Sequence, residues 1–539
     1  MTTEETINAG LAALRAGDDA RAETVLSALA ANGHVEALSL RGLARAGLGS
    51  DLALQDLRRA TELEPGEPRW WIHLGLGGMK LSVWGEAAHA FSQAIERGPS
   101  SAHKPLLLQR AEAEERSGDA IAALHSRESA STLGPMTPAE QYKLGLSQEA
   151  AMRYGPAKQT FVDLLAEAPQ VPELALASAR LARVHGQREE AEAILAKALE
   201  KHPQHVELLA THLEVSKSAQ STDFLERTVT DSAAGRSEKR RAAFALAGHY
   251  DQHQDHEKAW HFATLGNALY GRPDDPLAEE RRRVEAATAL FHQVEQNDKS
   301  DGITPVYLIG PPRSGGTVLQ RILSAPEGHA SLGERGALLS WFFSLRNNDV
   351  DVWQEHSASI AHSDIAGMMA LAPSASVITD KTPHHAQCAG LIHKLHPNAR
   401  FIDQRRNLFD VLVSIYLHPF KESFPFATRP KDIADYLVFR RRTVQSWINN
   451  GVPIDTMSYD EFAQQPASAA EALFSNLSWP WQDEYLAEYR GPATVKTFSI
   501  ESSREAVSAR FIGRSSAYRS FLKDLPDVFL ELADAPSND

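Results

Sequence analysis

The spacing of prolines in the first half of the chain constrains its fold more than any other feature. Five prolines are separated by 34, 36, 34 and 34 residues, and alanine and leucine dominate the stretches between them. Alanine and leucine favour helices and proline ends them, so the spacing predicts one helical unit repeated along the chain. The five are Pro65, Pro99, Pro135, Pro169 and Pro203.

A 34-residue period is the signature of the tetratricopeptide repeat (TPR), in which each copy is a pair of helices. One pair cannot bury its apolar face alone, so we predict that residues 1–295 stack into an all-α solenoid. The alternative is a helical bundle without repeats. The interior TPR pattern is carried by Trp71, Leu74, Gly75, Ala87 and Phe91, and more weakly by Ala157, Phe161, Ala191 and Leu195.

The concave surface of a solenoid can bind an acceptor or a partner protein, or it can serve a purely structural or dimerising role. The sequence leaves both possibilities open. The arginine run at 281–283 is predicted to lie on a solvated helix face, because charge runs on helices are mostly exposed.

The character of the sequence changes after residue 295. A polar stretch at 295–304 is predicted to be a linker. Short runs rich in β-branched residues then alternate with helical stretches, which predicts a parallel sheet covered by helices on both faces. We therefore expect a second domain at 303–539, with an α/β fold. The predicted strands are 306–309, 377–379, 401–402 and 454–457.

Composition argues against several classes of protein. The formal net charge of the 539 residues is -15, which argues against a chain that binds nucleic acid. The single cysteine, Cys388, excludes an internal disulfide framework. No run of 18 apolar residues predicts a membrane span, and the acidic start predicts no signal peptide. These features together predict a cytoplasmic protein. The histidines show no ligand spacing, so we expect no metal.

A glycine-rich turn from Gly310 to Thr317 follows the first predicted strand and leads into a predicted helix. Strand, glycine turn and helix are the geometry of a phosphate-binding loop (P-loop), where backbone N–H groups and the helix N-terminus attract an anion. A nucleoside-triphosphate loop would need lysine at position 316, but this chain has Gly316 there and carries Arg313 inside the loop. The alternative is a turn that only joins strand to helix.

Polar and basic residues also follow the other predicted strands. Ligands of open α/β sheets bind beyond the carboxyl ends of the strands, so we expect these residues to meet at one edge. They are Asp380, Lys381, Thr382 and Pro383 after the second strand, Arg405 and Arg406 after the third, and Tyr459 after the fourth.

These motifs resemble those of sulfotransferases that use 3′-phosphoadenosine-5′-phosphosulfate (PAPS). The resemblance covers roughly 303–525 and is strongest to TPR-linked bacterial sulfotransferases, which are related to tyrosylprotein sulfotransferases. It implies that the glycine loop binds the 5′-phosphosulfate and that Arg406 and Ser414 bind the 3′-phosphate, for which arginine supplies charge-assisted bonds. The implied nucleotide-binding residues are Arg313, Ser314, Gly315, Gly316, Thr317, Arg406, Ser414, Tyr459, Ser499 and Arg514.

The resemblance also implies the catalytic residues. Lys381 and Arg313 would approach the transferring sulfuryl group, and Ser499 would touch the phosphosulfate from a C-terminal lid. Glu334 is the expected general base, or else the partner of a neighbouring cation, and the histidines at 384–385 are the other candidates for the base. The chain departs from the usual family pattern at Gly316, His385, Asn407 and Ser515.

The predicted function is transfer of a sulfuryl group from PAPS to a hydroxyl of a protein tyrosine or a glycan, a reaction related to phosphoryl transfer. Two alternatives stay open: a P-loop kinase or nucleoside triphosphatase, and a TPR scaffold with an inactive transferase domain. The missing lysine argues against the first, and the retained Arg313, Lys381 and Arg406 argue against the second.

Overall fold

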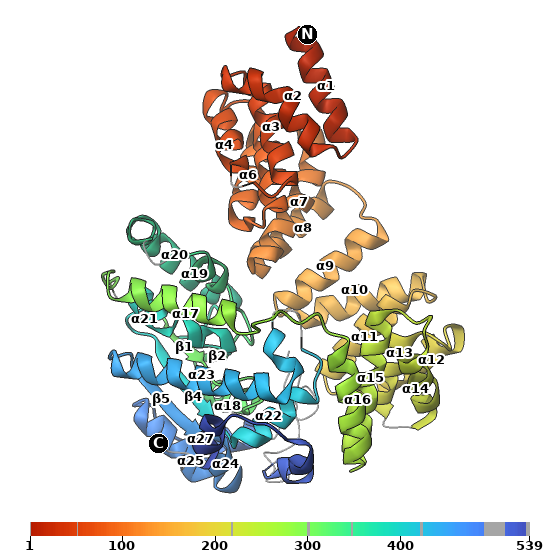
Figure 1. The fold of residues 1–539 in the computed structure, drawn as a ribbon, viewed down its shortest axis with the longest axis vertical. Helices are drawn as coiled ribbons and strands as arrows, with labels where there is room; N and C mark the ends of the chain where they lie inside the picture. The colour runs from red at the N-terminus through yellow and green to blue at the C-terminus, as the bar shows by residue number, and fades with distance from the viewer. Residues whose placement is uncertain are drawn as a thin grey trace. The chain divides into compact units, whose positions relative to one another are not determined.

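The computed structural model of the chain describes residues 2–50, 52–216, 219–298, 302–345, 349–420, 424–489 and 512–534. The chain divides into two compact units, Met1–Leu164 and Leu165–Asp539. The described part of the first unit consists of helices and their connections, whereas the second unit joins helices to a parallel sheet (Figure 1).

Helices of the first unit follow one another in pairs that repeat the predicted unit. Pro65, Pro99 and Pro135 each lie in the connection between one pair and the next, which confirms the predicted helical repeats. The helices are α1 (Thr3–Arg15), α2 (Asp19–Ala31), α3 (Val35–Gly47), α4 (Ala53–Leu63), α5 (Pro68–Lys80), α6 (Trp84–Arg97), η1 (Ser100–Ala102), α7 (His103–Ser117), α8 (Ala120–Thr132), α9 (Pro138–Ala150) and α10 (Tyr154–Glu167), the last of which continues into the second unit.

The two helices of a pair approach closely where a glycine of the first faces a large apolar side chain of the second. A Cβ atom at Gly75 would lie 2.6 Å from the ring of Phe91, and a Cβ atom at Gly145 would lie 2.7 Å from the ring of Phe161. Both rings are fully buried. The glycine and the aromatic residue of the repeat pattern are thus two halves of one contact, which any larger residue at the glycine would disrupt.

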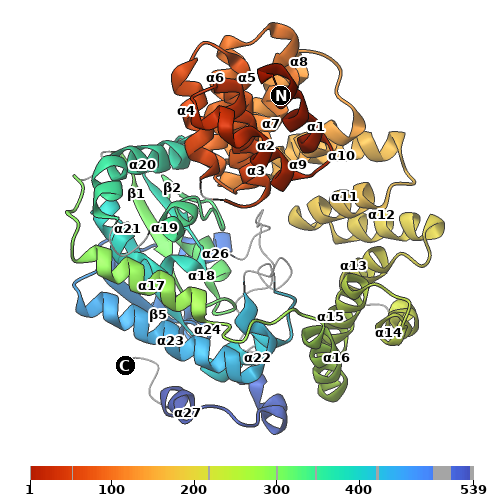
Figure 2. The ribbon, with the colours of Figure 1, turned by 45° about the horizontal axis from the view of Figure 1, so that its top comes forward.

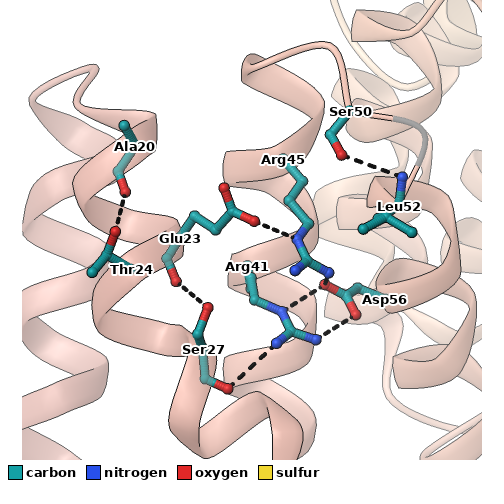
Figure 3. Close-up of polar contacts among 9 residues, drawn as sticks. All are labelled: Ala20, Glu23, Thr24, Ser27, Arg41, Arg45, Ser50, Leu52 and Asp56. Carbon is teal, nitrogen blue, oxygen red and sulfur yellow. Dashed lines mark hydrogen bonds and ion pairs between the residues drawn. The ribbon is translucent and has the colours of Figure 1, made fainter.

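A buried network of ion pairs joins α2, α3 and α4 (Figure 3). Arg41 donates two hydrogen bonds to the carboxylate of Asp56, at 2.7 and 2.8 Å, and Arg45 donates another at 2.8 Å. Arg45 also donates to Glu23 at 2.8 Å, and Arg41 donates to the backbone carbonyl of Ser27 at 3.3 Å. The side chain of Asp56 is only 8% exposed, so one carboxylate compensates two guanidinium groups away from water.

The substitution Asp56→Ala is expected to destabilise the first unit by about 3–5 kcal/mol, because it leaves the largely buried Arg41 without a carboxylate and Arg45 with Glu23 alone. In the control, Glu86→Ala removes the partner of the exposed Arg58, and we expect a loss of about 0–1 kcal/mol. Hydrogen exchange of the amides in α3 and α4 measures the free energy of opening in each variant. Equal losses in the two variants would contradict the role assigned to the buried network.

The second unit continues the helix pairs and then leads into the sheet. Apolar residues of its last pair share one hydrophobic core with α22 (Leu408–Tyr416) and α23 (Pro430–Asn449), which lie much later in the chain. Residues on both sides of the predicted linker therefore pack together. The helices before the sheet are α11 (Pro172–Val184), α12 (Arg188–Lys201), α13 (Val206–Ser216), η2 (Ala219–Ser221), α14 (Thr222–Thr230), α15 (Arg236–Gln252), α16 (His256–Ala268) and α17 (Ala278–Phe291).

A parallel sheet with the strand order β2-β3-β1-β4-β5 confirms the predicted α/β fold. In the central strand, Tyr307 pairs with Asp380 on one side and with Phe401 on the other. The four predicted strands are confirmed. Sequence analysis missed β2, whose His-Ala-Ser composition carries no strand signal. The strands are β1 (Thr304–Leu308), β2 (His329–Ser331), β3 (Val377–Asp380), β4 (Arg400–Arg405) and β5 (Ile454–Ser458).

Helices cover both faces of this sheet. The remaining elements are α18 (Gly316–Leu323), α19 (Leu339–Ser344), α20 (Val350–Leu371), η3 (Pro383–Gln387), α21 (Ala389–Leu395), η4 (Pro425–Thr428), α24 (Tyr459–Gln464), α25 (Pro466–Asn476), α26 (Glu484–Tyr489), η6 (Arg514–Phe521) and α27 (Asp527–Asp534). Tyr307 of β1 belongs to a core with α17, α20, α21 and α23, whereas Val306 and Leu308 belong to a core with α18, α24 and α25. Figure 2 shows α17 running beside α23, where Phe291 meets Trp447 edge-on.

No helix within the described part of the chain combines the length and the hydrophobicity that crossing a lipid bilayer requires.

Candidate active site

A pocket of 540 Å³ lies within the second unit, where the loops after β1, β3 and β4 meet the start of α24. Its volume is within the range of sites that bind small molecules, and its position is the one expected for an open α/β sheet. The structure thus brings together residues that are far apart in the sequence. The predicted residues that line the pocket are Arg313, Gly315, Gly316, Thr317, Glu334, Lys381, Arg406, Ser414, Tyr459 and Arg514.

One further predicted residue, Ser314, does not line this pocket. Ser314 is buried beneath the glycine loop, where its hydroxyl donates a hydrogen bond of 2.7 Å to the carbonyl of Pro311. It therefore holds the turn. Ser499 and the predicted C-terminal lid around it lie outside the described residues.

The glycine loop needs its glycines because of what lies against them. Gly315 has a φ of 98°, and a Cβ atom there would lie 2.2 Å from the ring of Tyr459. A Cβ atom at Gly316, the first residue of α18, would lie 2.2 Å from the side-chain amide of Gln404. Arg313 also has a positive φ, of 70°, which is uncommon for a residue with a side chain. Such a conformation is typical of loops whose backbone is arranged around an anion.

Two arginines approach each other at the centre of the pocket. The Arg313 Nε donates to the hydroxyl of Ser414 at 3.0 Å, and Arg406 Nη1 donates to the backbone carbonyl of Arg313 at 3.1 Å. The Arg406 guanidinium, whose side chain is 9% exposed, lies 4.9 Å from the ring centre of Tyr459. Burial and the positive charge of Arg406 lower the pKa of Arg313 to about 10, so Arg313 stays charged at neutral pH. An anion between them would relieve this repulsion.

Glu334 and Lys381 form an ion pair inside the pocket, with Lys381 Nζ donating to Glu334 Oε1 at 2.6 Å. The lysine side chain is 10% exposed, whereas that of the glutamate is 40% exposed. The neighbouring Arg335 turns away from the pocket and pairs with the buried Asp364. Adjacent residues of one loop therefore have different tasks, and Glu334 is the one that faces the pocket.

The two adjacent histidines also separate. His384 lines the pocket, and its pKa is lowered to about 4 by burial, with smaller contributions from the charges of Arg283 and His385. It is therefore neutral at pH 7 and able to accept a proton. His385 is fully buried and does not line the pocket. Its ring lies edge-on to that of Tyr307, with the ring centroids 5.0 Å apart.

Arg283 and Gln404 are among the pocket residues that sequence analysis missed. Arg283 of α17 lines the pocket with its guanidinium 4.0 Å from the ring centre of Phe343, so the prediction of a solvated face was wrong for this residue. Gln404 lines the pocket as well and accepts a hydrogen bond of 3.2 Å from Gly310 N. The period of two along β4 puts Gln404 on the same face as Arg406, a signal that could have revealed it. Arg405 points inward and pairs with Asp403 at 3.2 Å.

One departure from the family pattern has a structural explanation. Asn407 caps the N-terminus of α22, where its side-chain oxygen accepts hydrogen bonds from the backbone N–H groups of Phe409 and Asp410, both at 3.1 Å. An asparagine serves this purpose as well as an aspartate does. The described residues contain no group of three or more side chains arranged to hold a metal ion.

The fold and the pocket define an α/β protein with a glycine-rich loop beside a pocket at the edge of its parallel sheet. Comparison with known families agrees, because residues 305–483 match the sequence model of the sulfotransferase family. A protein of Aquifex aeolicus (strain VF5), described as uncharacterized, is 23% identical over 373 residues, which are 64% of this chain and 48% of the relative. The chain thus matches about half the length of that relative. The match to the sulfotransferase family is therefore confined to residues 305–483, in the C-terminal part of the chain, and the helix pairs precede it.

Solved structures similar to this chain include TPR proteins. The C-terminal part of a TPR repeat-containing protein from Cytophaga hutchinsonii is 17% identical, with a TM-score of 0.33. The match covers 49% of this chain and 95% of the Cytophaga chain. A tetratricopeptide repeat protein from Parabacteroides merdae is 17% identical, with a TM-score of 0.35. That match covers 50% of this chain and 93% of the Parabacteroides chain. The assignment of the repeats in this chain rests on its own helix pairs.

The substitution Gly316→Ala is expected to keep the fold but to damage the pocket, because the new methyl group meets the side-chain amide of Gln404 and the aliphatic chain of Lys381, both of which are flexible. We expect a turnover number at least tenfold lower and a melting temperature within a few degrees of the parent. Gly248→Ala is the matched control, since a Cβ atom there meets nothing within 4 Å. Full activity of Gly316→Ala would show that the close approach to this loop is unimportant.

Proposed function

We propose that this protein transfers a sulfuryl group from PAPS to the hydroxyl of an acceptor, releasing 3′,5′-diphosphoadenosine (PAP). The observation that carries the proposal is the meeting of Arg313, Lys381, Arg406 and Arg514 in one pocket beside a glycine loop. The chain as a whole has a net charge of -15, yet this pocket gathers four basic side chains. A ligand with several phosphate and sulfate groups fits such a pocket, because each group can take charge-assisted hydrogen bonds.

The nucleotide is proposed to lie across the carboxyl edge of the sheet. The glycine loop and Arg313 would hold the 5′-phosphosulfate at the N-terminus of α18. Arg406, Ser414 and Arg514 would hold the 3′-phosphate. Tyr459, whose ring lies against Gly315 and beside the Arg406 guanidinium, would contact the nucleotide from the start of α24.

The chemical step follows from this placement. The acceptor oxygen attacks sulfur in line with the bridging oxygen of PAPS, the new S–O bond forms as the old one breaks, and PAP leaves with the bonding electrons. Glu334 would take the proton of the acceptor hydroxyl, because its carboxylate lies in the pocket beside Lys381. Lys381 and Arg313 would stabilise the charge that develops on the transferring group and on the departing phosphate.

The wall of the pocket beyond Glu334 supports an aromatic acceptor, such as a protein tyrosine, over a glycan. It contains Phe343, Phe420 and Phe424, and His384 lies 4.6 Å from the ring of Phe424, measured between centroids. Aromatic rings pack well against one another, whereas a sugar presents several hydroxyl groups that need partners. A protein acceptor or partner would be bound by the helical repeats.

The nucleotide preference tests the assignment directly. We expect the protein to bind PAP at least tenfold more tightly than ATP, because ATP lacks the 3′-phosphate. Arg406→Ala should weaken PAP binding by about tenfold to a hundredfold, the worth of hydrogen bonds to a charged group. Arg400→Ala, at the other end of β4, is the matched control. Calorimetry that gives equal affinities for PAP and ATP would reject the proposed donor.

The general base is tested by Glu334→Gln, which keeps the shape of the side chain but cannot accept a proton at neutral pH. We expect unchanged PAP affinity and a turnover number lower by ~10²–10⁴-fold. His384→Asn is the comparison, because His384 is another proton acceptor in the pocket. If Glu334→Gln turns over like the parent and His384→Asn is inactive, the histidine is the base instead.

A further inference from the structure

A C-terminal segment brings Arg514 into the pocket, and a helix of the repeats holds that segment. Arg514, the first residue of η6, forms an ion pair with Asp251 of α15. The hydroxyl of Tyr518, one turn further along η6, donates a second hydrogen bond to Asp251 at 2.6 Å. The side chain of Asp251 is 10% exposed. A single carboxylate of the repeat region therefore holds both an arginine of the pocket and its neighbour.

The same segment is fixed from its other side by the transferase part. The carboxylate of Asp410, in α22, accepts hydrogen bonds from the backbone N–H groups of Gly513 at 2.7 Å and Ser515 at 2.8 Å. Asp410 also lies 3.9 Å from the guanidinium of Arg406. The backbone on either side of Arg514 is thus tied to the helix that follows β4, close to the other proposed 3′-phosphate residue.

Aromatic packing reinforces this junction. Trp260 of α16 stacks on Phe521 of η6, with ring centres 5.4 Å apart, and lies 4.3 Å from the ring of Tyr416 in α22. Tyr518 is fully buried. Asn267 of α16 donates a hydrogen bond of 3.0 Å to the backbone carbonyl of Tyr416. The last helix pair, η6 and α22 therefore form one packed body beside the pocket.

We propose that Asp251 is a positioning residue for recognition of the 3′-phosphate: from the repeat region it orients Arg514 toward the nucleotide. The proposal rests on the proposed function, since it assigns the 3′-phosphate to Arg514. A long arginine side chain loses rotamer freedom when it is fixed, and Asp251 fixes it before the nucleotide binds. The nucleotide site is then complete only when the last helix pair of the repeats is in place.

This assignment differs from two simpler ones. If Asp251 held Arg514 away from the nucleotide, its neutralisation would tighten PAP binding. If Asp251 only stabilised the junction, its neutralisation would weaken every nucleotide alike. Adenosine 5′-monophosphate (AMP), which lacks the 3′-phosphate, separates these cases because only PAP can gain from the orientation of Arg514.

The experiment titrates the full-length protein with PAP and with AMP. For Asp251→Asn we expect PAP affinity to fall by about tenfold and AMP affinity to change by less than twofold. Tyr518→Phe, which removes the second hydrogen bond to Asp251, should weaken PAP binding by a smaller factor. Asp255→Asn is the matched control. The Asp255 carboxylate caps α16 by accepting a hydrogen bond from Lys258 N, which has no part in holding Arg514. In steady-state kinetics, Asp251→Asn should raise the KM for PAPS and leave kcat within twofold.

A double-variant cycle completes the test. In an Arg514→Gln background, Asp251→Asn should have no further effect on PAP binding, because the orientation of Arg514 no longer matters. Equal losses for PAP and AMP, tighter PAP binding in Asp251→Asn, or additive effects in the double variant would each overturn the positioning role. A parent protein that binds PAP no better than AMP would instead overturn the proposed function itself.

Discussion

The guanidinium groups of Arg313 and Arg406 are held together at the carboxyl edge of the sheet, and much of the pocket is arranged to keep them there. Arg313 is placed by a loop with positive φ at Arg313 and Gly315, and Arg406 is placed by β4 and bonded to the loop backbone. Holding two cations close together is unfavourable without an anion. Three features help to hold the two arginines together: the Ser414 hydroxyl accepts from Arg313, the Tyr459 ring lies beside Arg406, and the loop glycines allow close packing. This need explains why residues from four separate stretches of the chain meet in one pocket.

The second constraint is the core shared by the repeats and the α/β part. Apolar residues of α15 and α16 pack in the same cluster as those of α22 and α23. The hydrophobic core therefore continues across residue 295 from the helix pairs into the α/β part. Two arginines illustrate the consequence. Arg283 reaches the pocket from α17, and Arg514 is held beside it by Asp251 of α15. Helices that the sequence assigns to a solenoid thus contribute to the site of the transferase domain.

The parts of the fold that could be predicted are those that short stretches of sequence determine. The proline period gave the helix pairs, and β-branched runs followed by basic residues gave four strands and the residues at their ends, because strand direction alone brings those ends together. β2 could not be predicted, since His329, Ala330 and Ser331 acquire strand conformation only by pairing with β3. Arg283 and Asp251 could not be predicted either, because their roles arise from tertiary contacts with residues 60 or more positions away. No local pattern records such contacts.

The most direct test of the account is a crystal structure of the full-length protein with bound PAP. The account predicts the 5′-phosphate at the glycine loop beside Arg313, the 3′-phosphate between Arg406, Ser414 and Arg514, and Asp251 still bonded to Arg514 on the side away from the phosphate. A nucleotide bound elsewhere on the chain, or one whose 3′-phosphate contacts neither Arg406 nor Arg514, would contradict it.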